Sequence, residues 1–585
     1  MCGIAGLIGD FDAYQLDAML LSQHHRGPDA TGKYSDGNFA ALGHNRLAII
    51  DLSSQSNQPF LDTSGRYVLV FNGEIYNYIE LKAELEGLYS FKTNSDTEVL
   101  LAAFLIYGHQ CLQKLNGMFS FAIWDNQDKK LFAARDRFGV KPFFYSVKNS
   151  SFYFSSEIKA IHAAGISKIP NEKVWASYFA YGSYGNPDET FWEKILQLPG
   201  GHFLQLQNQQ LILKKWYFFE EEVAKQPKNL TYEQAKDHYL VLLKDSIQLR
   251  FRADVPVGFN ISGGLDSSVL LALVNEQEKN KINNNVNDNR NVNVDAKINA
   301  YTFYTNNPDY DELPWVEMMI AKTKNPLTKV LLEADVVPDF AEKMAAQQDE
   351  PYGGIPTLAY AQLFEQARKD NVLVLLDGQG MDEQWAGYDY YTQENNATIQ
   401  GVMDSPFKRN MLSDIFLAKA EKPVYPKPFV DAILNKQYRD LFYTKIPRAL
   451  RFNDRISMLF STELREPFLD YRLVEFAFSL PLDFKIKNGI TKFVLREIAS
   501  EYLADDLIFA PKRPLQTPQR EWLADDLKKW VVDCFLTIEK SKYGLWFDKR
   551  ELEKELLLYF EGTIQSSFHI WQCISLCEMM QTVND

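Results

Sequence analysis

The first two hundred residues contain short apolar runs in which hydrophobic and polar positions alternate, and turn residues separate one run from the next. A period of two places successive side chains on opposite faces of a strand. Antiparallel sheets that bury one face commonly show this alternation. Strands are therefore predicted at 42–50, 68–71, 119–124, 131–135, 143–146, 203–206 and 211–214.

The pattern changes after a polar segment rich in Glu, Lys and Gln at 220–231, where we place a domain boundary. Beyond it, fully apolar runs alternate with helical patterns, as in a parallel sheet covered by helices. After Gly387 the chain is mainly helical in pattern. Strands are predicted at 255–261, 300–305, 327–332 and 372–376, and helices at 269–274, 336–347 and 357–369.

Residues 275–299 interrupt this alternation with a run dominated by Asn, Lys and Asp. The run is too polar to bury and has no periodicity. We expect a disordered surface insertion that carries no chemistry of its own.

Composition narrows the class of protein. A chain of 585 residues is too long for one core, and its formal charge of −15 argues against binding nucleic acid or a membrane surface. No apolar run is long enough to span a membrane, and no signal peptide is recognised. The five cysteines are few and irregularly spaced, so a cytoplasmic protein is expected. Cys573 and Cys577 share a helix face but supply only half a zinc site, so they are expected to pack in the core.

The segment Ser262–Ser268 follows a predicted buried strand and precedes a predicted helix. Gly263 and Gly264 allow a tight turn with free N–H groups, and the helix N-terminus adds a positive dipole, which together favour phosphate. Asp266 would repel phosphate unless a Mg²⁺ lies between them. The alternative is a Ser/Gly turn that only caps the helix.

A second loop, Asp377–Glu383, leaves the predicted strand at 372–376 and is acidic and rich in glycine. Ligands of open parallel sheets bind outside the carboxyl ends of the strands, so both loops are expected to face one crevice. Asp382 would then be a second Mg²⁺ ligand opposite Asp266. A solvated acidic turn is the alternative. Further along, Lys492 opens a helix at its positive end, where a bound anion such as pyrophosphate would justify it; an ordinary surface lysine is the alternative.

The amino terminus carries different chemistry. Removal of Met1 would leave Cys2 with a free α-amino group, whose reference pKa near 7.7–8.0 suits a base for its own thiol. An incidental cysteine is the alternative. Arg46 could hold a carboxylate bidentately, and Asn72 with the N–H of Gly73 could form an oxyanion hole. Asp96 could bind a substrate ammonium, but helix capping is the favoured interpretation from sequence alone.

Residues 1–215 resemble the glutaminase domain of class II glutamine amidotransferases, on the motifs around Cys2, 25–29, 43–51, 72–77, 135–142 and 155–160. The resemblance implies an α+β N-terminal-nucleophile hydrolase sandwich. It also implies that Cys2 attacks the glutamine amide and that Asn72 and Gly73 hold the oxyanion. Arg46 would bind the α-carboxylate of glutamine, and Glu74 and Asp96 its α-ammonium.

The order of both halves resembles glutamine-dependent asparagine synthetases over nearly the full chain, with residues 216–585 as an ATP-pyrophosphatase synthetase domain. The loop 262–268 is similar to that family's pyrophosphate loop and lacks the Lys of the common P-loop. The resemblance implies glutamine, ATP with Mg²⁺ and aspartate as ligands, internal ammonia transfer, and an acyl-adenylate; it is also compatible with a homodimer. Lys492 would stabilise the leaving pyrophosphate. The implied ATP-binding residues are Ile261, Ser262, Gly263, Gly264, Asp266, Ser267, Tyr304, Asp377 and Gly378.

One position departs from the family pattern. The usual loop reads Ser-Gly-Glu-Gly-Ser-Asp-Glu, whereas Gln379 replaces its first Glu here. Glutamine keeps hydrogen bonding but loses basicity, so any base role passes to a neighbour, of which Asp377 is the closest in sequence. The acceptor could accordingly be another carboxylate, such as a sugar acid or secondary metabolite. A glutaminase feeding a phosphoribosyl transferase leaves 262–268 unexplained, and a non-catalytic sensor would be expected to lack Cys2, Asp266 or Asp382.

Overall fold

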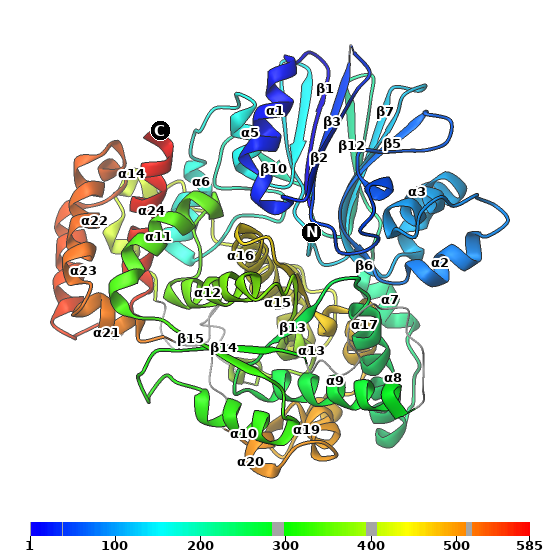
Figure 1. The fold of residues 1–585 in the computed structure, drawn as a ribbon. Helices are drawn as coiled ribbons and strands as arrows, with labels where there is room; N and C mark the ends of the chain where they lie inside the picture. The colour runs from blue at the N-terminus through cyan, green and yellow to red at the C-terminus, as the bar shows by residue number, and fades with distance from the viewer. Residues whose placement is uncertain are drawn as a thin grey trace.

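A computed structural model describes residues 2–37, 39–283, 298–392, 406–510, 517–564 and 566–584. The amino-terminal part contains two six-stranded antiparallel sheets that lie face to face (Figure 1). In spatial order, the first sheet consists of β10 (Leu196–Gln197), β8 (Phe144–Lys148), β9 (Ser151–Ser155), β1 (Gly3–Ile8), β3 (Ala40–Arg46) and β2 (Ala30–Ser35). The second consists of β12 (Gln210–Lys215), β11 (His202–Gln207), β7 (Lys130–Arg135), β6 (Gly117–Asp125), β5 (Tyr67–Ile75) and β4 (Phe60–Leu61).

The amino-terminal part has four layers, with the two sheets inside and helices outside. The alternation of hydrophobic and polar positions along the strands explains this arrangement. Side chains on the inner faces, among them Ile4, Val70, Trp124 and Phe154, form one buried cluster between the sheets. The opposite faces of the sheets pack on helices, with α1 (Ala13–Ser22) and α5 (Ile158–Ala163) on the first sheet and α2 (Tyr78–Leu85) and α3 (Asp96–Tyr107) on the second (Figure 1). The predicted α+β sandwich of the N-terminal-nucleophile type is confirmed.

The strand predicted at 42–50 is too long, because β3 ends at Arg46. The chain then leaves the sheet, and the Arg46 guanidinium donates hydrogen bonds to the carbonyl oxygens of Ile50, Asp51 and Ser53. An arginine at the strand end thus folds the following segment back on itself. Apolar residues alone could not reveal this turn.

The second half is built on a five-stranded parallel sheet in which β13 lies at the centre. Helices cover both faces, as predicted: α11, α12 and α16 lie on one side and α8, α9 and α10 on the other (Figure 1). The strand order is β15 (Leu327–Leu331), β14 (Ala300–Tyr304), β13 (Val257–Asn260), β16 (Val374–Leu376) and β17 (Glu463–Arg465). The helices are α8 (Tyr232–Arg250), α9 (Leu265–Asn283), α10 (Leu313–Thr323), α11 (Val337–Gln348), α12 (Ile355–Lys369) and α16 (Lys445–Leu459).

Strand β17 lies in the region that was predicted to be mainly helical. Its sequence Glu463-Leu464-Arg465 is short and charged, yet it pairs in parallel with β16, and both charged side chains are fully buried. Each charge has the other as its partner, since Arg465 Nε donates to Glu463 Oε1 at 2.5 Å. Charge pairing therefore replaces the apolar pattern on which the prediction of strands depends.

The polar insertion begins later than expected. Helix α9 continues to Asn283, so 275–283 is helical where disorder was predicted, and residues 284–297 lie outside the described residues. Asn275 is tied into the fold, since its Nδ2 donates to Leu271 O and to Asn325 Oδ1 at 2.9 and 2.8 Å.

The remainder of the chain is largely helical, as predicted. Helices α22 (Lys528–Lys540) and α24 (Phe568–Asn584) bury Cys534, Cys573 and Cys577 in a core shared with α6 (Glu172–Tyr181) of the first half. Cys573 and Cys577 both pack in the core as expected. The Cys577 Sγ also lies within 4.8 Å of ligand atoms of Cys534 and Glu578. Within the described ranges, no helix combines the length and hydropathy needed to cross a bilayer. Further helices are α7 (Phe219–Lys225), α15 (Ala432–Phe442), α17 (Tyr471–Ser479), α19 (Phe493–Ser500) and α23 (Lys549–Phe560).

Candidate active sites

Cys2 precedes β1 and is buried between the ends of the two antiparallel sheets. Its nitrogen donates to Asn72 Oδ1 at 3.1 Å, and its Sγ lies 3.9 Å from Leu47 O. Burial raises the pKa of the Cys2 thiol, an effect that nearby Arg46 and the amino terminus partly offset. A buried thiol of this kind needs an adjacent base before it can act as a nucleophile.

Asn72 and Gly73 lie on β5, which runs beside β6 in the second sheet. Gly73 has φ +151°, and a Cβ there would lie 2.1 Å from Met118 O, so only glycine fits. The Asn72 amide is itself held, since Nδ2 lies 3.5 Å from Ser156 Oγ. The structure thus brings the two predicted oxyanion donors beside Cys2 on a rigid strand.

Glu74 and Asp96 form an acidic pocket next to these donors. Both are buried, and Glu74 Oε2 has no hydrogen-bond partner among the described residues. Burial raises the pKa of Asp96 to about 6, with Glu463 acting in the same direction, and burial with Glu463 and Asp96 raises the pKa of Glu74 well above its usual range. Two crowded carboxylates are electrostatically suited to receive a cation such as a substrate ammonium.

The preferred sequence interpretation of Asp96 as a helix cap is wrong. Ser95 caps α3 by accepting a hydrogen bond from Thr97 N, whereas Asp96 Oδ2 accepts one from Ile75 N at 2.9 Å. Asp96 therefore points from the first turn of α3 to the end of β5. This orientation supports its alternative role in the acidic pocket.

Arg46 is placed near Cys2 but is already engaged. Besides the three carbonyl oxygens of its loop, its Nη1 donates to Asn57 Oδ1 at 2.8 Å. The guanidinium therefore orders the loop at 50–57, and its predicted contact with a glutamine carboxylate remains a prediction.

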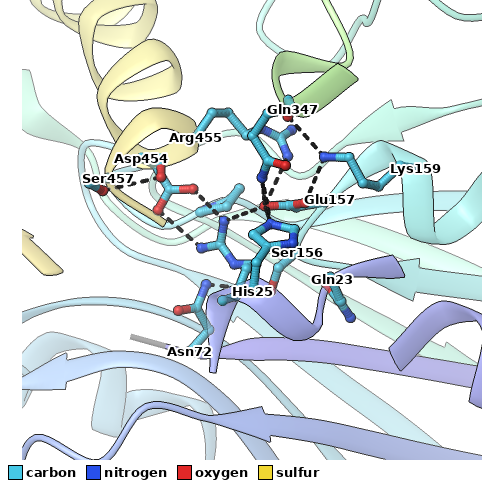
Figure 2. Close-up of polar contacts among 12 residues, drawn as sticks. Gln23, His25, Asn72, Ser156, Glu157, Lys159, Gln347, Asp454, Arg455 and Ser457 are labelled. Atoms are coloured by element: carbon cyan, nitrogen blue, oxygen red, sulfur yellow. Dashed lines mark hydrogen bonds and ion pairs between the residues drawn. The ribbon is translucent and has the colours of Figure 1, made fainter. Parts of the chain in front are cut away.

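Arg26 connects the Cys2 site to the second half of the molecule, a link that sequence reasoning missed. Its Nε donates to Cys2 O at 3.0 Å and its Nη1 to Glu157 Oε1 at 2.8 Å. Nη1 and Nη2 also donate to both carboxylate oxygens of Asp454 on α16, at 2.8 and 3.1 Å. All three side chains are buried. In Figure 2, Asp454 projects from a helix towards this network, and the Glu157 carboxylate has polar contacts with His25, Lys159 and Gln347.

The sequence signals for this network are the polar residues around Arg26 and those around Asp454. They are 428 residues apart, so no local pattern pairs them.

The second site is a cavity of about 720 Å³ at the carboxyl ends of β13 and β16. This position and size suit a small-molecule ligand of a parallel sheet. Tyr304 lies outside the lining, and its strand contributes Thr302 and Phe303 instead. The other predicted ATP-site and metal-site residues all line the cavity: Ile261, Ser262, Gly263, Gly264, Asp266, Ser267, Asp377, Gly378, Asp382 and Lys492.

Asp266 and Asp382 converge on one cation. Lys492 Nζ lies 2.8 and 2.6 Å from the two oxygens of Asp266 and 2.7 Å from Asp382 Oδ1. The two carboxylates raise the pKa of Lys492. A Cβ at Gly387 would lie 1.9 Å from Asp382 Oδ1 and 2.3 Å from Lys492 Cε, so a larger residue there would displace these two side chains. Two carboxylates that share one cation position have the oxygen ligands that could hold Mg²⁺.

Asp377 is held tightly at the floor of the same cavity. Its Oδ2 accepts a hydrogen bond from Tyr360 OH at 2.5 Å, and its Oδ1 accepts one from Gly378 N at 2.6 Å. Asn260 Nδ2 donates to the same tyrosine oxygen at 3.0 Å. Burial raises the pKa of Asp377, while these two hydrogen bonds lower it.

A sandwich with a buried cysteine before its first strand, joined to a parallel sheet with a glycine-rich loop after its central strand, fits the class of ATP-dependent ligases that take nitrogen from glutamine. The glutamine amidotransferase domain family matches residues 1–217, and the asparagine synthase family matches residues 238–582. The chain belongs to the family of glutamine-hydrolysing asparagine synthetases.

Named relatives cover almost the whole chain. It is 30% identical to asparagine synthetase [glutamine-hydrolyzing] 3 of Bacillus subtilis (strain 168), over 97% of this chain and 95% of the relative. Asparagine synthetase [glutamine-hydrolyzing] 1 of the same organism is 26% identical over 98% and 95%. A relative with another name, amidase chry2 of Gibberella zeae, is 26% identical over 93% of both chains.

Asn72→Ala should lower the kcat of glutamine hydrolysis by about 10²–10³, the usual effect of one missing oxyanion donor. KM for glutamine should change much less, because the amide acts mainly on the transition state. Steady-state glutaminase kinetics measure both. A raised KM with unchanged kcat would assign Asn72 to substrate binding instead.

Asp454→Leu should lower the free energy of unfolding by about 3–5 kcal/mol, because it removes one partner of the fully buried Arg26 guanidinium. Asp17→Ala is the matched control, since it removes the partner of exposed Lys33 and should cost only about 0–1 kcal/mol. Urea unfolding measures both. Equal shifts for the two variants would contradict a structural role for the Arg26 network.

Proposed function

We propose that the protein makes asparagine from aspartate, ATP and glutamine, releasing glutamate, AMP and pyrophosphate. The convergence of Asp266, Asp382 and Lys492 at a phosphate-binding loop carries this proposal. The same chain has a buried cysteine beside two oxyanion donors, and its relatives named asparagine synthetase cover nearly its full length.

In the first half-reaction, the α-amino group of Cys2 takes the thiol proton and Sγ attacks the glutamine amide carbon. Asn72 Nδ2 and the N–H of Gly73 stabilise the oxyanion of the tetrahedral intermediate. Glu74 and Asp96 hold the α-ammonium in the acidic pocket. Ammonia leaves the intermediate, and water then hydrolyses the thioester to release glutamate.

In the second half-reaction, the loop at 262–268 orients the phosphates of ATP so that an aspartate carboxylate oxygen attacks the α-phosphorus. Asp266 and Asp382 would hold Mg²⁺, which when bound neutralises phosphate charge. Lys492 is released from the two carboxylates to neutralise the departing pyrophosphate. Ammonia from the first site then displaces AMP from the acyl-adenylate.

A second acceptor class rests on a specific observation. Gln379 lines the cavity where the family pattern has a glutamate, and a relative of similar coverage bears the name amidase chry2. A different carboxylate would require no change at the Cys2 site or the phosphate loop. The acceptor alone would differ.

The proposal predicts that aspartate, among carboxylic acids offered one at a time, triggers pyrophosphate release from ATP. The measurement is carboxylate-dependent exchange of labelled pyrophosphate into ATP, with product amide identified by mass. Exchange with another carboxylate and none with aspartate would replace asparagine by that amide as product.

Asp266→Asn and Asp382→Asn should each abolish ATP cleavage to AMP and pyrophosphate and leave glutamine hydrolysis intact, because both carboxylates serve one cation position. The double variant should therefore be no worse than either single variant, a clear departure from additivity. Glutaminase activity of the same preparations reports folding. Normal amide formation in either variant at ordinary Mg²⁺ concentrations would refute the metal assignment.

A further inference from the structure

Glu466 is a buried acid at the sheet edge that faces the ATP cavity, and neither half-reaction above uses it. It follows β17 directly, as Asp377 follows β16. The two strands are parallel, with Leu376 opposite Arg465, and Asp377 N donates to Arg465 O at 3.0 Å. The two acids therefore leave neighbouring strand ends side by side.

Glu466 also lines a second, small cavity of about 20 Å³ between the two halves of the molecule. This volume exceeds the roughly 10–15 Å³ that one water-sized molecule requires, and ammonia is of that size. Met118 of β6 lines the same cavity, and Met118 O is the atom that Gly73 approaches closely. The small cavity thus lies between the strands that carry the oxyanion donors and the edge of the ATP-binding sheet.

The surroundings of Glu466 favour reversible protonation near neutral pH. Burial raises its pKa to about 8, Lys141 and Arg250 oppose this shift, and Asp377 and Asp136 reinforce it. Burial raises the pKa of the nearby Tyr76 and Tyr360, and the Glu466 carboxylate acts in the same direction on both. The described residues offer the carboxylate no hydrogen bond, whereas Asp377 is tied to Tyr360 and Gly378.

We propose that Glu466 is the proton acceptor that converts ammonium to ammonia next to the acyl-adenylate. It would supply the basicity that Gln379 lacks, from the strand end next to Asp377 and the small cavity behind it. This inference rests on the proposed function, in that it requires an acyl-adenylate in the cavity of the second site. It requires no particular carboxylate.

Ammonium gives one proton to the Glu466 carboxylate, and the freed electron pair of ammonia forms the carbon–nitrogen bond to the acyl carbon. The bond from that carbon to the phosphate oxygen breaks, and AMP leaves. A second nitrogen proton goes to the departing phosphate oxygen, which yields the neutral amide, and Glu466 then returns its proton to solvent.

Glu466→Gln is the direct test, because it preserves shape and removes the proton acceptor. Amide formation from ammonium at neutral pH should fall by about 10²-fold, within the range of general base catalysis, while pyrophosphate exchange stays unchanged. Glu475→Gln is the matched control. Glu475 is also buried, burial raises its pKa to about 7, and it lines neither cavity. Its replacement should leave both rates unchanged.

Hydroxylamine distinguishes a proton acceptor from a merely structural residue. It is a weaker base than ammonia and is mostly unprotonated at neutral pH, so it needs no acceptor before it attacks. The loss in Glu466→Gln should therefore be much smaller with hydroxylamine than with ammonium. With ammonium as the nitrogen source, the rate of amide formation by the variant should rise with pH in proportion to the concentration of free ammonia. The wild-type rate should be higher than this proportion at neutral pH and should level off near pH 8.

Equal losses with both amines, or losses of pyrophosphate exchange and amide formation together, would overturn the inference. So would an unchanged rate of amide formation. If Glu466→Gln does not fold, as judged by glutaminase activity, Glu466→Asp replaces it as the test. Because aspartate keeps a carboxylate, this variant, like the wild type, should form amide from ammonium faster than the concentration of free ammonia alone allows. Absence of carboxylate-dependent pyrophosphate exchange in the wild type would instead refute the proposed function. Failure of the proposed function can therefore be distinguished from failure of the inference about Glu466.

Discussion

The hydrogen bonds of the buried Arg26 guanidinium join the two halves of the molecule at the Cys2 site. It donates hydrogen bonds to the Cys2 carbonyl oxygen, a carboxylate of its own half and a carboxylate of α16 at the same time. A charge removed from water is tolerated only when it is paired and fully hydrogen-bonded. The position of the Cys2 backbone and the docking of α16 are therefore one structural constraint rather than two.

The cost of burying a charge without a partner also bears on the carboxylates of both candidate sites. Glu74 and Asp96 crowd together with Glu463, and Arg465 Nη2 lies 3.8 Å from Glu74 Oε1. At the other site, Lys492 forms ion pairs with both Asp266 and Asp382. In each place carboxylates crowd around one cation position, which would suit a substrate ammonium at the first site and a metal–phosphate assembly at the second. Such crowding of titratable groups is typical of functional sites.

Local chemistry made parts of both sites predictable from sequence. The loops at 262–268 and 377–383 each combine strand, glycine and acid within a few residues, and their convergence follows from the geometry of parallel sheets. Lys492 was identifiable because a cation opens a helix, which the helix dipole disfavours. Asp96 was misassigned because Ser95 competes for the same capping position. β17 and the Arg26–Asp454 pair were unpredictable, since each depends on charge pairing that leaves no apolar pattern.

The 428-residue separation between Arg26 and Asp454 also has a consequence during synthesis. Domains generally fold as they emerge from the ribosome, at about 5–20 residues per second. For roughly 20–90 seconds the nascent glutaminase half therefore has Glu157 but no Asp454 to neutralise Arg26. The contacts that hold the Cys2 backbone are therefore complete only after the loops at 262–268 and 377–383 have been translated. Order of translation alone thus delays the finished surroundings of Cys2 until most of the second half has been made.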